Sequence, residues 1–226
     1  MKTRLFSLVC LATGILFIIA HSCQLVTVAF ISKVLIIPPL MVIFILNLRR
    51  DSNRLHKYMF AGLFFSWIGD VLLEVPGGGE VMFMAGLGGF LLSLLMYAFV
   101  FFRTPGKNEV FHGRFYLLIP VLFYGIAMGL YLNKYLGEMR LPVIVYETAM
   151  IAMLAGAVSR IGKVNRISYI MVLAGAILFI ISDSVLAINK FVQPVSLSTL
   201  IIMVTYIAAQ WLITIGYVKQ STGKLE

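Results

Sequence analysis

Long apolar runs follow one another along almost the whole of this sequence, and each is close to the length that crosses a bilayer. A transmembrane helix needs about 20 predominantly apolar residues, and runs of this kind fall at 5–21, 29–47, 58–75, 81–102, 115–133, 141–158, 168–188 and 197–218. Charged residues make up only 12% of the chain, against about 25% in soluble domains. The sequence therefore predicts an all-α polytopic membrane bundle of eight transmembrane helices, forming a single domain over residues 1–226.

The basic residues are divided unequally between the two ends of these helices. The first run follows two basic residues but has no clear cleavage site, so we interpret it as a retained first helix rather than a signal peptide. Fourteen basic residues fall on the side of the N-terminus: Lys2, Arg4, Arg49, Arg50, Arg54, Lys57, Arg103, Lys107, Arg114, Arg160, Lys163, Arg166, Lys219 and Lys224. The other side has Lys33, Lys134, Arg140 and Lys190. The positive-inside rule then predicts that both termini are cytoplasmic. The sequence has no basic patch suited to binding a nucleic acid, so a nucleic acid is not expected as a partner.

Two carboxylates interrupt the third run, "FAGLFFSWIGDVLLEV", where a lipid-facing helix would have none. A charged aspartate at the centre of a membrane helix costs about 2.5–3.5 kcal/mol on insertion scales. Such residues usually face the interior of a bundle or a wet cavity. Gly62, Ser66, Asp70 and Glu74 follow i, i+4 spacing and share one helix face, which predicts a polar stripe directed at a cavity. Tyr206 and Gln210 form a similar pair on the last helix.

A short internal repeat relates the third and seventh helices. "FFSWIGDVLL" aligns with "LFIISDSVLA" so that Asp70 coincides with Asp183. The two helices are four apart in an eight-helix chain, which predicts a parallel four-plus-four repeat with one aspartate from each half at the same depth. Glu147 and Lys33 are expected near the same level in the outer half of the bilayer. The "MAGLGG" stretch that opens the fourth helix predicts close packing of helix backbones.

Alternatives exist for each of these ionisable groups. Glu74 could reach the membrane interface, and Lys33 could extend its ammonium to it. Asp70 and Asp183 could serve only to hold helices together through hydrogen bonds. The three histidines, His21, His56 and His112, are too few and too scattered for a zinc site, so neither a metal nor another cofactor is expected. There is also no nucleophile elbow. A buried carboxyl pair, one protonated and one ionised, remains as an acid/base couple.

Four stretches stand out along the chain: "GLFFSWIGDVLL", "FMAGLGGFLLSLLMYAFVF", "FIISDSVLAINKF" and "YIAAQWLI". By these stretches, the chain resembles the YhhN-like lysoplasmalogenase family. The resemblance implies an eight-helix membrane hydrolase that cleaves the vinyl ether bond of lysoplasmalogens to a fatty aldehyde and glycerophospho-ethanolamine or -choline. The motif aspartates carry over to Asp70 and Asp183. Two positions depart from the family pattern: Val34 follows the lysine where a proline is usual, and Leu94 lies near the place of a histidine.

The predicted site follows from the residues and the resemblance together. Asp70 and Asp183 are the predicted catalytic residues; the predicted substrate-binding residues are Lys33, Ser66, Glu74, Glu147, Ser182, Tyr206 and Gln210. The expected partners are a lysophospholipid substrate and membrane lipid, and the expected location is a bacterial inner membrane. A small proton-coupled transporter and a non-catalytic lipid-binding protein are the competing hypotheses, because intramembrane acids also serve proton relays.

Overall fold

The computed structural model describes residues 2–48, 54–106 and 115–222, and all regular elements in these ranges are helical. The prediction of an all-α chain is therefore confirmed. The α-helices are α1 Lys2–Ser22, α2 Val26–Val34, α3 Ile37–Asn47, α4 Leu55–Leu73, α5 Gly79–Phe102, α7 Ile119–Asn133, α8 Arg140–Val158, α9 Arg166–Ala187 and α10 Ser198–Thr222. Three short helical turns, Phe115–Leu118, Gly137–Met139 and Ile188–Val192, extend α7, α8 and α9.

The second predicted helix, 29–47, is divided in two. α2 ends at Val34, and α3 begins at Ile37 with Pro38 and Pro39 in its first turn. Proline has no backbone N–H and disfavours the helical conformation in the residue before it, so a helix that meets a proline pair breaks ahead of it. The break leaves Lys33 in the last turn of α2, next to the interior of the bundle.

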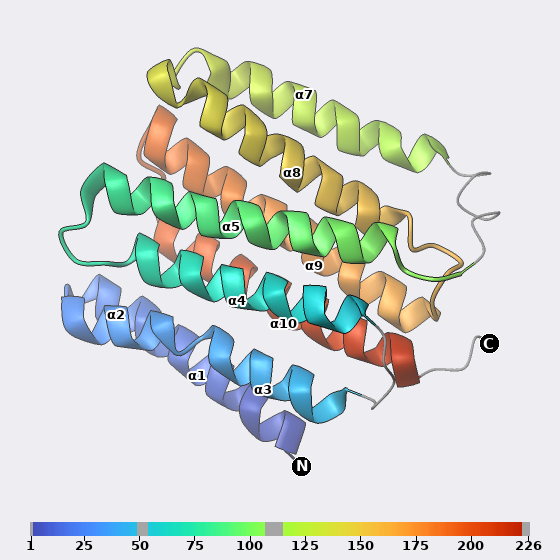
Figure 1. Cartoon of the computed structure of the whole chain (residues 1–226). Helices are drawn as coiled ribbons and strands as arrows, with labels where there is room; N and C mark the ends of the chain where they lie inside the picture. Colours follow the sequence, from blue (N-terminus) through green and yellow to red (C-terminus); the bar gives the residue numbers. More distant parts are fainter. Residues whose placement is uncertain (1, 49–53, 107–114, 223–226) are drawn as a thin grey trace.

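The helices lie side by side in one bundle, with the hairpins α4–α5 and α9–α10 at its centre (Figure 1). These two hairpins have the most extensive packing in the described part of the chain, and α8 covers α5. α1, α2 and α3 flank one side and α7 the other (Figure 1). The helices that carry Asp70 and Asp183 thus both belong to the central hairpins, in the arrangement that a four-plus-four repeat requires; the repeat itself remains a prediction.

Glycines allow the two helices of the α4–α5 hairpin to approach closely. A Cβ at Gly89 would lie 2.9 Å from the backbone nitrogen of Gly69. Real Cβ atoms do not approach backbone this closely, so the position requires glycine at this helix spacing. The close packing predicted from "MAGLGG" is therefore present at its last residue, Gly89, where the absence of a side chain lets α5 approach α4.

Seven helical segments among the described residues are long and apolar enough to cross a membrane, which makes the chain an integral membrane protein. The predicted 58–75 span corresponds to α4 and is not one of the seven. α4 includes His56, Lys57 and Asp70, which lower its mean hydropathy. The count of eight spans therefore remains a prediction.

The start of α1 and the end of α10 lie at the same end of the bundle (Figure 1). This agrees with an even number of crossings, while the assignment of that end to the cytoplasm remains a prediction. Part of that prediction depends on Arg49, Arg50, Lys107, Arg114 and Lys224, which lie outside the described residues, as does His112.

Candidate functional site

Asp70 lies in the interior of the bundle, near the end of α4. Its side chain is 1% exposed. The hydroxyl of Tyr206 on α10 donates a hydrogen bond of 2.7 Å to the Oδ2 atom of Asp70. A carboxyl group buried this deeply needs such partners, because an unsatisfied polar group out of water costs several kcal/mol. The polar stripe of α4 and the polar pair on the last helix, each identified from the sequence, are thus in direct contact.

A buried hydrogen-bond network continues from this contact along α4, α5 and α10. The amide nitrogen of Gln210 donates to Ser66 at 2.8 Å, and Ser66 shares a 2.6 Å hydrogen bond with Ser93 on α5. The hydroxyl of Tyr97 donates to the amide oxygen of Gln210 at 2.8 Å. Every member is buried. A saturated network of this kind fixes the relative positions of the three helices and of Tyr206, four residues before Gln210.

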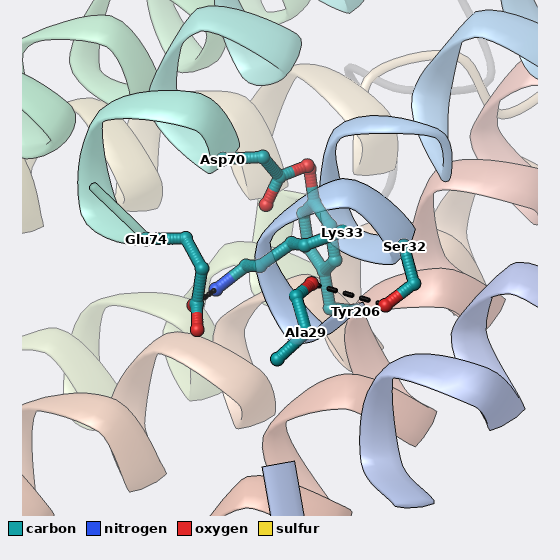
Figure 2. A network of polar contacts seen from close by, with 6 residues as sticks. All are labelled: Ala29, Ser32, Lys33, Asp70, Glu74 and Tyr206. Atoms are coloured by element: carbon teal, nitrogen blue, oxygen red, sulfur yellow. Dashed lines mark hydrogen bonds and ion pairs between the residues drawn. The ribbon is translucent and has the colours of Figure 1, made fainter. Parts of the chain in front are cut away.

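Lys33 and Glu74 form an ion pair beside Asp70. The ammonium of Lys33 lies 3.0 Å from the Oε2 atom of Glu74, and Figure 2 shows it extending from α2 between Glu74 and Asp70. Their side chains are only 12% and 19% exposed. The two groups are thus paired with each other and largely enclosed by the bundle. The aromatic ring of Phe17 on α1 lies 5.1 Å from the same ammonium.

Asp183 has a separate tyrosine partner. The hydroxyl of Tyr146 on α8 donates to the Oδ2 atom of Asp183 at 2.6 Å. Glu147, the next residue, has its Oε1 atom buried without a hydrogen-bond partner. Both carboxyl groups line a cavity of about 40 Å³ between α5, α7, α8 and α9. A cavity of more than about 15 Å³ with polar partners can hold a water molecule, so this one has room for two or three waters.

Three aromatic rings pack edge to face beside the contact between Tyr206 and Asp70. The ring of Tyr206 lies 5.7 Å from that of Phe90 on α5 and 5.8 Å from that of Phe179 on α9. These rings are buried, so the carboxyl group of Asp70 lies next to an apolar cluster.

The structure therefore sorts the predicted site residues into two clusters. The first contains Lys33, Ser66, Asp70, Glu74, Tyr206 and Gln210. The second contains Glu147 and Asp183. Ser182 belongs to neither, because its hydroxyl donates to the backbone oxygen of Ile202 on α10.

Several polar residues of the site were not predicted. They are Ser93, Tyr97, Tyr124, Tyr146 and Ser184. Ser93 and Tyr97 are four residues apart on an otherwise apolar helix, so the i, i+4 rule that identified the α4 stripe applies to them too. Tyr146 carries no such pattern, since only the packing of α8 on α9 brings it to Asp183.

Comparison with known proteins adds a family and several relatives. The model of the YhhN family matches residues 28–217. The human lysoplasmalogenase TMEM86B is 32% identical over 161 residues, which cover 71% of this chain and 63% of that protein. Lysoplasmalogenase TMEM86A of Bos taurus is 32% identical over 71% of this chain and 65% of its own length. A lysoplasmalogenase of Mycobacterium tuberculosis is 28% identical over 73% of this chain and 62% of its own length.

The matched part of the chain thus spans somewhat less than two thirds of these relatives. No solved structure matches.

Proposed function

The chain belongs to the YhhN family, as its motifs indicated, and we propose that it is a lysoplasmalogenase, a membrane hydrolase that cleaves the vinyl ether bond of lysoplasmalogens. The observation that carries this proposal is the pair of aspartates, Asp70 buried and Asp183 half-buried, each held by a tyrosine from another helix. Relatives named lysoplasmalogenase at 28–32% identity support it. The products would be a fatty aldehyde and glycerophospho-ethanolamine or glycerophosphocholine.

The reaction requires a proton donor and a water molecule. Transfer of a proton to the β-carbon of the vinyl ether converts the C=C bond to a C–C bond and leaves an oxocarbenium ion. Water adds to the carbon next to the ether oxygen and gives up a proton, which forms a hemiacetal. As the hemiacetal C–O bond to the glycerol oxygen breaks, the glycerol oxygen takes the proton that the base removed from water. The hemiacetal hydroxyl oxygen becomes the carbonyl of the aldehyde, and its proton returns to the carboxylate that donated the first proton. One water is consumed, and the acid and base are restored. Two carboxyl groups suffice for this cycle, as in glycoside hydrolysis.

The surroundings of the two aspartates support different roles. The cavity beside Asp183 and Glu147 has room for water, which favours Asp183 as the group that activates it. Asp70 does not line that cavity and is held at one oxygen by Tyr206, which favours Asp70 as the group that delivers the proton. Lys33 would bind the substrate phosphate, for which a lysine ammonium is a common partner.

The membrane arrangement that goes with this function has eight spans, a four-plus-four repeat and cytoplasmic termini. The acids would then lie toward the outer face, and the location we propose is a bacterial inner membrane. Both termini at one end of the bundle and the central position of the two aspartate-bearing hairpins support this arrangement.

Hydrolysis in D2O tests the reaction directly. Purified protein in detergent is incubated with lysoplasmenyl-ethanolamine or lysoplasmenyl-choline. The released aldehyde is trapped, and the mass of the trapped product is measured by mass spectrometry. Carbon protonation predicts one deuterium on the carbon next to the aldehyde group. Release of aldehyde without that deuterium would rule out this mechanism. No aldehyde from either substrate would overturn the proposed function and favour proton-coupled transport.

A further inference from the structure

An apolar groove runs between α1 and α10 on the outside of the bundle. Its volume is about 360 Å³, within the range of about 300–1,000 Å³ that is usual for small-molecule sites. It is lined from α1 by Ser7, Cys10, Leu11, Gly14, Ile15 and Ile18, and from α10 by Val204, Ile207, Ala208 and Trp211. Apart from the Ser7 hydroxyl and the Trp211 indole N–H, this lining is apolar or weakly polar.

The packing of α1 explains why the groove is present. α1 packs mainly on α2 and α3 and makes fewer contacts with α10. Small residues recur on the side of α1 that faces α10, at Ser7, Cys10 and Gly14. At Gly14 the two helices meet, because a Cβ there would lie 2.2 Å from the Cδ1 atom of Ile207. Next to this contact, the small side chains leave the space of the groove between the two helices.

The two ends of the groove have different surroundings. At one end, the indole N–H of Trp211 donates a 2.9 Å hydrogen bond to the hydroxyl of Ser7 and joins the two walls. At the other end, Ile18 on α1 follows Phe17, whose ring lies 5.1 Å from the ammonium of Lys33. The eight residues from Val204 to Trp211 span seven helical steps and give the groove a length of about 10 Å along α10.

One part of the groove lies near the first carboxyl cluster. Cys10 lines the groove and is only 1% exposed, so this wall reaches the interior of the bundle. On the opposite wall, Ile207 follows Tyr206, the residue that holds Asp70. The groove therefore runs beside the segment of α10 that positions the buried acid.

We propose that this groove receives the alkenyl chain of the substrate, an inference that rests on the proposed function. The phosphate would lie at Lys33, the vinyl ether next to Asp70, and the chain would run along the groove toward Trp211. The groove opens between Leu11, Ile15 and Val204, which are 52%, 58% and 53% exposed and face the hydrocarbon of the bilayer. A single-chain lipid can thus enter sideways from the membrane. The cavity beside Asp183, about 40 Å³, is the size of a few waters and cannot hold the chain.

Chain-length kinetics test this assignment with Ala208→Phe, which fills the groove. The matched control is Leu8→Phe, on α1 but outside the groove and 63% exposed. Both variants are compared with wild type on a long-chain and a short-chain vinyl ether glycerophospholipid. We expect Ala208→Phe to raise KM for the long-chain substrate by about tenfold or more, since excluding two methylenes is enough for that, with little change for the short chain. An equal effect on both substrates, or none, would overturn the assignment.

Photolabelling keeps this test separate from the proposed function. The probe is a single-chain ether lysophospholipid with a diazirine at the end of its chain, which needs no turnover. We expect wild type and Asp70→Asn to be labelled on α1 and α10 within the groove, and Ala208→Phe to lose that label. Uniform labelling of all lipid-exposed helices would mean that only bulk lipid fills the groove, and this result would overturn the proposal. Groove labelling without aldehyde release from wild type would instead count against the hydrolase function alone.

Discussion

The hydroxyl of Tyr206 on α10 donates a 2.7 Å hydrogen bond to the carboxyl group of Asp70 on α4. Tyr146 on α8 makes the corresponding contact to Asp183 on α9, at 2.6 Å. Each acid is therefore oriented by a helix other than its own, and each keeps one oxygen outside the tyrosine contact. A carboxyl group held in this way is ready to exchange a proton without first having to be positioned.

Removal of either tyrosine hydroxyl should slow turnover. A hydrogen bond to a charged group contributes about 1.5–3 kcal/mol, so we expect Tyr206→Phe and Tyr146→Phe each to lower kcat by about 10- to 100-fold. Aldehyde release measures this. Tyr116→Phe is the control, because Tyr116 is 60% exposed. Wild-type kcat in either test variant would show that the tyrosine does not orient its acid.

The ion pair of Lys33 and Glu74 predicts two changes of KM in opposite directions. Lys33→Met removes the proposed phosphate partner and should raise KM about tenfold or more. Glu74→Gln removes the carboxylate that competes with the phosphate for the ammonium, 3.0 Å away, and should lower KM. A vinyl ether without a phosphate serves as the control substrate and should respond to neither change. A rise of KM in both variants would contradict phosphate binding at Lys33.

Two adjacent glycines on α5 should differ sharply in their tolerance of a methyl group. Gly89→Ala places a Cβ 2.9 Å from the backbone of α4, whereas nothing lies within 4 Å of a Cβ at Gly88. We expect Gly89→Ala to lower Tm in detergent and to reduce activity by separating α4 from α5. Gly88→Ala should leave Tm unchanged or raise it, since alanine favours a helix by about 1 kcal/mol over glycine. Equal effects would show that the hairpin is not packed through Gly89.

Arg160 is fully buried where α8 ends and is expected to join three helices. Its Nη2 atom donates to Ser168 on α9 at 3.0 Å and to Gln220 on α10 at 2.8 Å. Burial lowers the pKa of its guanidinium to about 10, so it stays charged at neutral pH. Arg160→Ala would leave both acceptors without their donor and open a cavity. We expect it to lower the free energy of unfolding by about 2–4 kcal/mol.

Thermal unfolding in detergent measures the effect of Arg160→Ala. Arg166→Ala is the control, because Arg166 is an exposed residue at the start of α9. The free energy of unfolding of Arg166→Ala should differ from that of wild type by no more than about 0.5 kcal/mol. A Tm for Arg160→Ala equal to that of the control would mean that the buried guanidinium does not hold the three helices together.

The sequence was informative where a single helix carries the signal. Apolar length predicted the helices, and i, i+4 spacing predicted that Ser66, Asp70 and Glu74 share a face of α4. The proline pair that separates α2 from α3 was visible in the sequence, but its effect on a predicted continuous helix was missed. The partners of the acids could be predicted only in part, because a residue such as Tyr146 reaches Asp183 through packing between helices. The burial of Arg160 could not be predicted for the same reason. In the sequence it is one more basic residue at a helix end, yet the packing of three helices buries it.

The most direct test compares wild type with Asp70→Asn and Asp183→Asn in release of aldehyde from lysoplasmenyl-ethanolamine. Asparagine keeps the shape of aspartate and an oxygen for the tyrosine, so Tm should be preserved. General acid/base catalysis contributes about 10²–10⁴-fold, and we predict losses of this size in both variants, with Glu138→Gln in an exposed turn as the unaffected control. Aldehyde release near the wild-type rate in either folded variant would contradict catalysis by the two aspartates.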